Sequence, residues 1–326
     1  MLPVPVIETR GLVKRYDDQL AVAGIDLTVG PGEIYGLVGP NGAGKTTTMR
    51  ILATLLAPSA GEARVCGIPV TEDPVAVRRL IGYMPDFYGV YDDLRVWEYL
   101  DFFARCYRVP SARRPAVIAE LLEIVGLTAK RDAYVEALSR GMRQRLCLAH
   151  TLVHDPQLLI LDEPASGLDP RSRVEMREIL RELRRMGKTI LVSSHILPEL
   201  GELVTRVGII DHGRLLRSGS LSEIERSLRA TALLRIDVLG ETVGIDAAIA
   251  WLGTDARVSS VLQATDPGIA PARLEVGFDG DGEAQASLLA AMVAEGHRVS
   301  GFTQATSDLE ELFLQVTGQH DGEEAA

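Results

Sequence analysis

The sequence has few cysteines and no long apolar run. Its three cysteines, Cys66, Cys106 and Cys147, lie far apart, so they predict neither a disulfide framework nor a metal cluster, and we expect small core residues in a reducing compartment. The N-terminus lacks the basic and apolar regions of a signal peptide, and no uncharged apolar run approaches the roughly 18 to 20 residues that cross a bilayer. We therefore expect a chain that is soluble by itself and needs a partner for any role at a membrane.

Basic charge is also in short supply. The 34 Lys and Arg residues are outnumbered by 45 Asp and Glu residues, which gives a formal net charge of -11 at pH 7. Such a chain has no basic footprint, so nucleic acid is not expected as the main partner. The length of 326 residues, of which 46% are hydrophobic, predicts an ordinary globular protein of two domains.

Residues 39–47 have the spacing G-x-x-x-x-G-K-[ST] of a phosphate-binding loop. They follow the apolar run 34–38, which predicts a buried strand, and precede apolar positions at 49–56 that are spaced for a helix. In that setting the backbone N–H groups and the helix N-terminus face phosphate oxygens. Lys45 is expected to reach the β- and γ-phosphates of a nucleotide, and the Thr46 hydroxyl to bind Mg²⁺. The alternative is a glycine-rich turn with an incidental lysine, and the flanking elements argue against it. The residues expected to contact the nucleotide here are Gly39, Asn41, Gly42, Gly44, Lys45, Thr46 and Thr47.

An aromatic residue lies ahead of this loop, in a segment that predicts an antiparallel ribbon over 6–15 and 25–29. Tyr16, at the end of the first strand, could stack on a purine. On position alone, a core or rim tyrosine is an equally good interpretation.

Two acidic residues end another apolar strand, predicted over 158–161. Asp162 and Glu163 lie at its C-terminal end, where ligands of α/β sheets bind. Adjacent strand residues point in opposite directions, so one carboxylate can face a metal while the following turn directs its neighbour toward a nucleophile. A further buried strand over 189–194 places His195 at its end. An isolated histidine at a strand end would ordinarily be a satisfied structural residue.

Residues 94–154 have helical periodicity and predict an inserted helical subdomain. Its last helix is expected over 143–154, and Ser139 is a candidate N-cap whose following amides would face an anion. Ahead of the subdomain, a strand at 81–84 leads into a loop containing Asp86 and an aromatic cluster. The cluster is either part of the subdomain core or an exposed docking groove for a partner. It comprises Phe87, Tyr88, Val90, Tyr91, Leu94 and Trp97.

Beyond residue 220 short alternating segments replace the long apolar runs. The predicted order of strand, helix, strand, strand, helix, strand indicates a small ferredoxin-like α+β unit, closed by a helix at 308–316. This part contains no recognisable catalytic cluster.

Five features follow one another in the order found in one protein family: the loop at 39–47, residues 138–142, the strand that ends in Asp162 and Glu163, residues 166–169, and His195. In these features the sequence resembles the ATP-binding-cassette (ABC) transporter ATPases. The resemblance implies an α/β fold of the P-loop NTPase class over residues 1–220, with the helical subdomain at about 87–155. Residues 221–318 look like the accessory domain of bacterial export subunits, and residues 319–326 are expected to be a tail.

The resemblance also implies roles for single residues. The family pattern assigns Tyr16 to adenine stacking, Asp162 to Mg²⁺ through water, and Glu163 to polarising the attacking water. It assigns His195 to a hydrogen bond with the γ-phosphate, and Asp169 to the junction of two subunits.

Members of this family resemble one another in closing as dimers. The resemblance therefore implies that Ser139 and Gly141 of one subunit approach ATP held by the loop of the other. One phosphate-binding loop and one such signature in the chain imply a homodimer or a paralogous ATPase partner.

The sequence departs from the family pattern at two sites. Asp86 stands where a glutamine is usual, and the signature, usually Leu-Ser-Gly-Gly-Gln, contains Arg140 and Met142. Aspartate can still provide an oxygen ligand to Mg²⁺, although it adds negative charge beside the phosphates. These departures predict slow hydrolysis.

The resemblance implies the ATP-hydrolysing subunit of a bacterial exporter, peripheral on the inner face of the cell membrane and paired with a separate multi-helix permease. The substrate cannot be read from this chain. One alternative is an ABC ATPase that acts on ribosomes or DNA, but the second cassette or long coiled coil of such relatives is not found in the sequence. The other is a nucleotide-gated regulatory module with negligible turnover, which the altered signature and Asp86 favour.

Overall fold

The structure is a computed structural model that describes residues 4–17, 19–86, 89–201, 203–228, 232–240, 242–264 and 271–304. Its contacts divide the chain into two units, of which the first runs to Leu221 and the second begins at Ser222. Phe87, Tyr88, the predicted helix at 308–316 and the tail lie outside the described residues. Within the described part of the chain, no helix has the length and apolar character needed to span a bilayer.

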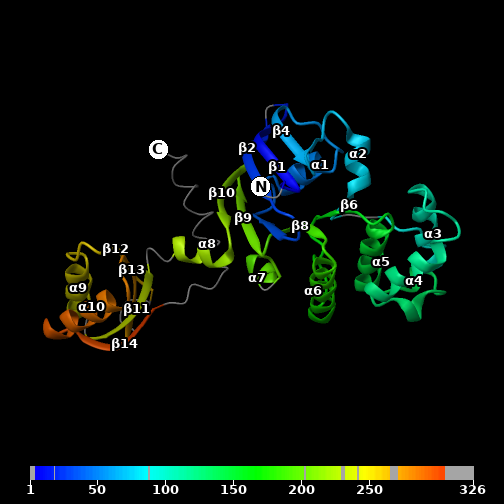
Figure 1. Cartoon of the computed structure of the whole chain (residues 1–326). Helices are drawn as coiled ribbons and strands as arrows, with labels where there is room; N and C mark the ends of the chain where they lie inside the picture. Colours follow the sequence, from blue (N-terminus) through cyan, green and yellow to red (C-terminus); the bar gives the residue numbers. More distant parts are fainter. Residues whose placement is uncertain are drawn as a thin grey trace. The chain divides into compact units, whose positions relative to one another are not determined.

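The first unit is built around a six-stranded sheet of order β10-β9-β3-β8-β7-β6 (Figure 1). Neighbouring strands from β9 to β6 are parallel, and β10 pairs antiparallel at one edge. All residues of β3, β7 and β8 are buried, which explains their continuous apolar sequences. The C-terminal ends of the parallel strands therefore meet at one edge of the sheet. The strands are β3 (Ile34–Val38), β6 (Ile81–Met84), β7 (Leu158–Leu161), β8 (Thr189–Ser194), β9 (Arg206–Asp211) and β10 (Arg214–Gly219).

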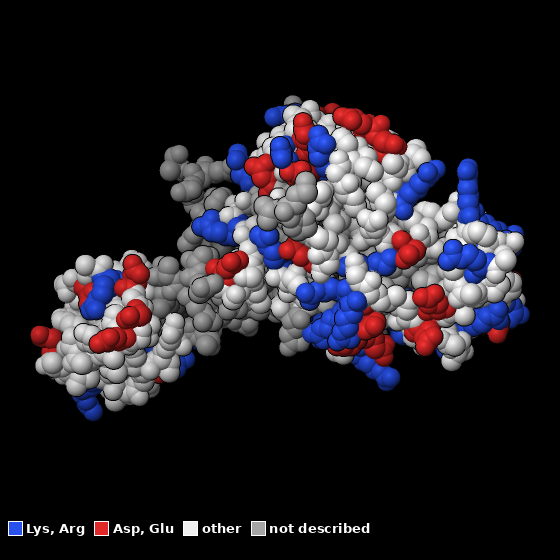
Figure 2. Space-filling view, viewed as in Figure 1, with Lys and Arg blue, Asp and Glu red and all other residues white. Residues whose placement is uncertain are grey.

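Helices connect these strands. They are α1 (Lys45–Leu52), α2 (Pro74–Leu80), α6 (Pro170–Arg185) and α7 (Leu197–Leu200). The sequence of α6 predicts a solvated face of mixed charge, and Figure 2 shows both signs intermixed over this helix. Its ion pairs at helical spacing include Arg171 with Glu175 at 3.1 Å and Arg185 with Glu182 at 2.9 Å.

A second, antiparallel sheet of order β2-β1-β4-β5 packs on α1. Its strands are β1 (Ile7–Tyr16), β2 (Gln19–Val29), β4 (Ala60–Val65) and β5 (Ile68–Pro69). Strand β2 begins at Gln19, well before the predicted start at residue 25, because it pairs with β1 through bulges along most of its length. One continuous core joins this sheet to α1 and to the parallel sheet; Leu12, Ile25, Met49 and Ile160 are among its fully buried residues.

The predicted helical subdomain is present as α3 (Val96–Cys106), α4 (Arg114–Ile124) and α5 (Arg140–Leu152), with 3₁₀ turns at Thr128–Lys130 and Val135–Ala137. The three helices pack on one another and lie together beyond β6 (Figure 1). Helix α5 begins at Arg140 instead of the predicted residue 143. The reason is the cap at Ser139, whose hydroxyl accepts a hydrogen bond from the Met142 amide at 3.3 Å. The N-cap prediction is confirmed.

The second unit contains β11 (Ala232–Leu239), α9 (Thr242–Leu252), β12 (Val258–Gln263), β13 (Ala272–Phe278), α10 (Gly282–Ala294) and β14 (Arg298–Gln304), preceded by α8 (Leu221–Leu228). Its sheet has the order β12-β13-β11-β14, and every neighbouring pair is antiparallel. The element order is the expected one, and the ferredoxin-like assignment stays a prediction. One face of the sheet packs its apolar residues, among them Ile236 and Leu274, against α9 and α10. Two cross-strand ion pairs, Arg235 with Glu275 and Asp237 with Arg273, lie on alternate residues of β11 and β13.

Candidate active site

The predicted site residues gather at the C-terminal edge of the parallel sheet. The phosphate-binding loop follows β3, Asp162 and Glu163 follow β7, and His195 follows β8. Asp86 comes two residues after β6. Parallel strand direction alone brings these segments together, since each strand ends at the same edge.

The loop after β3 depends on glycine at two places. A Cβ at Gly39 would lie 2.2 Å from the Ile210 carbonyl oxygen, and one at Gly44 would lie 2.5 Å from the Ala21 oxygen. Gly44 also has φ +103°, a conformation that other residues rarely adopt, and serves as the N-cap of α1. The first turn of α1 contains no acidic residue, so its N-terminus is free to face an anion.

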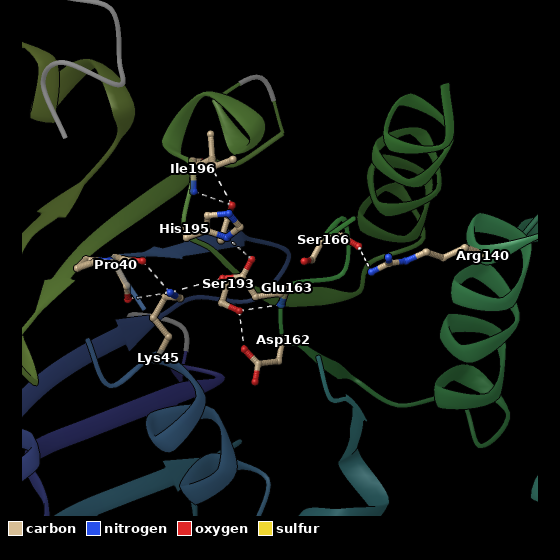
Figure 3. Close-up of polar contacts among 11 residues, drawn as sticks. Pro40, Lys45, Arg140, Asp162, Glu163, Ser166, Ser193, His195 and Ile196 are labelled. Carbon is tan, nitrogen blue, oxygen red and sulfur yellow. Dashed lines mark hydrogen bonds and ion pairs between the residues drawn. The ribbon is translucent and has the colours of Figure 1, made fainter. Parts of the chain in front are cut away.

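Lys45 is a buried cation at the floor of this loop, with a side chain only 6% exposed. Its Nζ donates to the Gly39 carbonyl oxygen at 2.6 Å and to that of Pro40 at 3.1 Å (Figure 3). The same atom lies 3.4 Å from Glu163 Oε1. Lys45 is therefore held beside the loop, from where its Nζ can turn to phosphate oxygens.

Glu163 is held between two basic side chains. Its Oε2 lies 2.8 Å from His195 Nδ1, while its Oε1 faces Lys45. Its backbone has φ 50°, the left-handed region that is uncommon for a residue with a side chain. Such strain is typical of functional positions, where the surrounding structure holds the residue in place.

Asp162, the neighbour of Glu163 in the sequence, points into the protein, and only 1% of the residue is exposed. Its Oδ1 accepts the Ser193 hydroxyl at 2.7 Å. Its other oxygen, Oδ2, is buried and has no hydrogen-bond partner among the described residues. An orphaned carboxylate oxygen here suits a water molecule of a Mg²⁺ shell.

These segments surround a pocket of about 400 Å³. The predicted residues that line it are Tyr16, Asn41, Gly42, Gly44, Lys45, Thr46, Thr47, Asp86, Glu163 and His195. Gln19, Ala21, Pro40, Ala43 and Ser166 complete the lining. Tyr16 is 41% exposed, so it is a rim residue and not a core residue. Its stacking on adenine stays a prediction.

The Asp86 carboxylate lies in an environment that disfavours its charge. Burial raises the pKa of Asp86, and the neighbouring carboxylates of Asp162 and Glu163 raise it further, while Arg140 and His195 oppose the shift. Among the described residues, no three His, Cys, Asp or Glu side chains form a metal site by themselves. Asp86 and Asp162 would give Mg²⁺ the one or two carboxylates that it takes, with water and phosphate completing its shell.

Ser139 and Gly141 do not line this pocket. They lie at the N-terminus of α5, where a Cβ on Gly141 would come within 2.6 Å of Ser172 Oγ. The Ser139 residue is exposed, and so is available to a second molecule. The predicted site residues therefore lie at two separate places on one subunit.

Ser193 and Gln144 were not predicted from the sequence, and Ser166 was predicted only as part of the feature at residues 166–169. Ser193 accepts the Glu163 amide at 2.9 Å, and Gln144 donates to the Pro164 carbonyl oxygen at 2.5 Å. The sequence carries no signal that singles out Ser193, because Thr189 and Ser194 are also polar residues of this buried strand.

The chain is similar to known proteins over most of its length. The family profile described as "ABC transporter" matches residues 22–166. Over 319 residues the chain is 39% identical to the daunorubicin/doxorubicin resistance ATP-binding protein DrrA of Streptomyces peucetius, covering 97% of this chain and 93% of that protein. It is 43% identical over 219 residues to the Nod factor export ATP-binding protein I of Burkholderia lata, covering 67% of this chain and 72% of that protein.

Solved structures are similar over about two thirds of the chain. One, described as the ATP binding subunit of an ABC transporter, has a TM-score of 0.62 at 29% identity and covers 68% of this chain and 92% of its own. Another, cbiO1 from Clostridium perfringens, part of the ABC transporter complex cbiONQ, has a TM-score of 0.61 at 25% identity and covers 69% of this chain and 94% of its own.

Proposed function

Because this chain belongs to the ABC transporter family, as an exporter-type ATP-binding subunit with ATPase activity, we propose that two such subunits close around ATP to drive export through a separate membrane permease. The observation that carries the proposal is the convergence of Lys45, Glu163 and His195 at one pocket, with Glu163 between the two basic groups. The permease selects the substrate, which this chain does not contact in our proposal.

In the proposed mechanism the loop amides, Lys45 and the N-terminus of α1 bind the β- and γ-phosphates. Thr46, Asp86 and Asp162 would hold Mg²⁺, the first two from the pocket lining and the third through the orphaned Oδ2. When bound, Mg²⁺ neutralises charge on the phosphate oxygens. The Tyr16 ring forms the rim of the pocket on the side of β1, where the base would stack.

Glu163 is proposed to polarise the attacking water. Once Lys45 turns to the phosphates, the Glu163 oxygen that faces it becomes free to accept a hydrogen bond from water. His195 then hydrogen-bonds the γ-phosphate from the end of β8. The backbone positions of both residues are fixed by the sheet, so their side chains are already close to the geometry that the reaction needs.

The divided site supports a dimer. Ser139 and Gly141 lie outside the pocket at a capped helix N-terminus, a place that favours anions. In our proposal they complete the site of a second copy or of a paralogous ATPase. Similarity to ATP-binding proteins named for drug resistance and Nod factor export supports a role in export. In our proposal the subunit lies on the inner face of the membrane beside the permease.

Paired variants test the function. Glu163→Gln keeps the size of the side chain, so we expect ATP binding to persist while phosphate release falls roughly a hundredfold or more, with an ATP-bound dimer in size-exclusion chromatography. Lys45→Ala should instead weaken ATP binding in calorimetry. Unchanged phosphate release by Glu163→Gln would refute the assignment. A wild-type protein that binds ATP without turnover would favour the regulatory module.

A further inference from the structure

An arginine from the first turn of α5 lies over the loop that follows Glu163. Arg140 Nη2 donates to the Ser166 carbonyl oxygen at 3.2 Å, and Figure 3 shows it reaching across from α5. The guanidinium lies directly against Gly167, where a Cβ would come within 2.2 Å of Nη2 and 2.4 Å of Cζ. Gly167 also has φ +66°. The contact therefore requires glycine at 167, both for space and for backbone conformation.

The same helix holds the loop at a second point. Gln144 lies four residues after Arg140, on the same face of α5. Its buried amide donates to the Pro164 carbonyl oxygen at 2.5 Å. Helix α5 thus contacts the loop of residues 164–168 both at its start and at its middle.

This loop is short and continuous with Glu163. The Ser166 amide donates to the Glu163 carbonyl oxygen at 3.0 Å, and the loop ends at Asp169, the N-cap of α6. Glu163 itself is in the left-handed region, at φ 50°. A displacement of Ser166 would consequently be transmitted to the backbone of Glu163, and with it to a carboxylate that lies 2.8 Å from His195.

We propose that Arg140 is a positioning residue for ATP hydrolysis, which holds the 164–168 loop against α5 and thereby sets the direction of the Glu163 carboxylate. Arg140 stands where the family pattern has a glycine, which has no side chain to make this contact. The inference rests on the proposed role of Glu163. It also gives α5, and the helical subdomain with it, a direct mechanical connection to the reacting centre.

The test compares Arg140→Ala and Arg140→Lys with the control Arg143→Ala. Arg143 lies in the same turn of α5 but donates to the Glu136 carbonyl oxygen at 2.6 Å, away from the loop. We expect Arg140→Ala to lower kcat about tenfold while KM for ATP changes less than about twofold, because a small misplacement of a reacting group costs rate more than binding. Arg140→Lys should recover part of kcat, and Arg143→Ala should match wild type.

Hydrogen exchange in the nucleotide-free protein separates this role from a contact with a partner subunit's ATP. Exchange of the amides in residues 163–169 should rise about tenfold in Arg140→Ala and stay unchanged in Arg143→Ala, since loss of the contact permits local opening. A fall in kcat with unchanged exchange would overturn the proposal. So would wild-type kcat in Arg140→Ala. If Glu163→Gln keeps full turnover while exchange still rises, the fault lies in the assigned role of Glu163, and the claim that Arg140 positions it fails with that role.

Discussion

Ser193 donates its hydroxyl proton to Asp162, 2.7 Å away, across the boundary between two neighbouring parallel strands. The same hydroxyl accepts the backbone amide of Glu163 at 2.9 Å. The Ser193 side chain therefore holds both the Asp162 carboxylate, which is proposed to bind the metal, and the backbone of Glu163, which is proposed to polarise the water.

Removing this hydroxyl should affect stability and activity together. Ser193→Ala leaves Asp162 Oδ1 without its hydrogen bond and the half-buried Glu163 amide without an acceptor. We therefore expect a loss of about 2 kcal/mol in unfolding free energy and a lower kcat. Urea titration followed by Trp97 fluorescence in a Trp251→Phe background reports on the first unit alone. Ser194→Ala is the matched control, because its hydroxyl bonds the backbone of Ile196. Wild-type stability in Ser193→Ala, or an equal fall of kcat in Ser194→Ala, would contradict the prediction.

Asp86 is expected to govern the Mg²⁺ dependence of the ATPase. Asp86→Asn removes its charge with little change of shape, and we expect the Mg²⁺ concentration for half-maximal activity to rise about threefold to tenfold, as for the loss of one weak carboxylate contact. Asp86→Gln installs the residue usual in the family and gives a second comparison. The wild-type Mg²⁺ requirement should also increase as the pH falls, because protonation removes the charge of Asp86. Since the pKa of Asp86 is raised, this increase should begin at a higher pH than for an ordinary aspartate. Superimposable Mg²⁺ titrations would place Asp86 outside the metal site.

His150 is expected to make the first unit sensitive to mild acid. It stacks on Phe103 with ring centroids 4.2 Å apart, and the Tyr99 hydroxyl lies 3.2 Å from its Nδ1. Burial, with a smaller contribution from His154, lowers the pKa of His150 to about 4. In the unfolded chain His150 has a pKa near 6.5 and is protonated below that pH. In the folded chain it stays neutral down to about pH 4. Unfolding free energy should therefore fall as pH drops from about 6.5 to 4, by up to about 3 kcal/mol from this residue.

The measurement is the difference in urea stability between pH 7 and pH 5. His150→Gln, which cannot titrate, should reduce that difference, whereas the exposed His212→Gln should leave it as in wild type. His154, whose pKa burial also lowers, accounts for part of the remaining dependence. A difference that is the same in all three proteins would rule out His150 as its source.

Tyr91 is expected to contact the permease. Its side chain is 55% exposed, and its ring meets Phe102 edge to face at 5.5 Å, so an apolar surface faces solvent beside the loop of Asp86. This exposure excludes a core role for Tyr91; Phe87 and Tyr88, which belong to the same predicted cluster, lie outside the described residues. Tyr91→Ser should reduce co-purification with a co-expressed permease, while basal ATPase activity stays near wild type and the melting temperature shifts by less than about 2 °C. Tyr134→Ser, at a ring that is 46% exposed in the same subdomain, is the control. If Tyr91→Ser still co-purifies with the permease as wild type does, the docking surface does not include Tyr91.

Much of the site could be predicted because its residues lie at strand ends. An apolar run fixes a strand, the parallel arrangement brings the strand ends to one edge, and polar residues directly after those runs then become neighbours. Lys45, Glu163 and His195 are brought together in this way. The glycines at 39 and 44 could be predicted for the same reason, since the loop must turn sharply between β3 and α1.

The remaining parts depend on contacts between distant segments. Ser193 looks like any small residue of a buried strand until β7 is placed beside β8. Arg140 is recognisable as a departure from a pattern, but its contact with Gly167 requires α5 to be packed against the loop after Glu163. The early start of β2 and the early start of α5 were missed because pairing with β1 and the cap at Ser139 outweigh local apolar periodicity.

The alternating ion pairs of the second unit also have a consequence for how its sheet assembles. In the observed register Arg235 faces Glu275 and Asp237 faces Arg273. A slip of β11 against β13 by two residues would keep the apolar side chains on the covered face, so burial alone would not reject it. It would, however, place Arg235 opposite Arg273, and like charges directly across an antiparallel pair are destabilising. The charged face of the sheet thus favours the observed register of β11 and β13 over the slipped one, although both registers would bury the same apolar side chains.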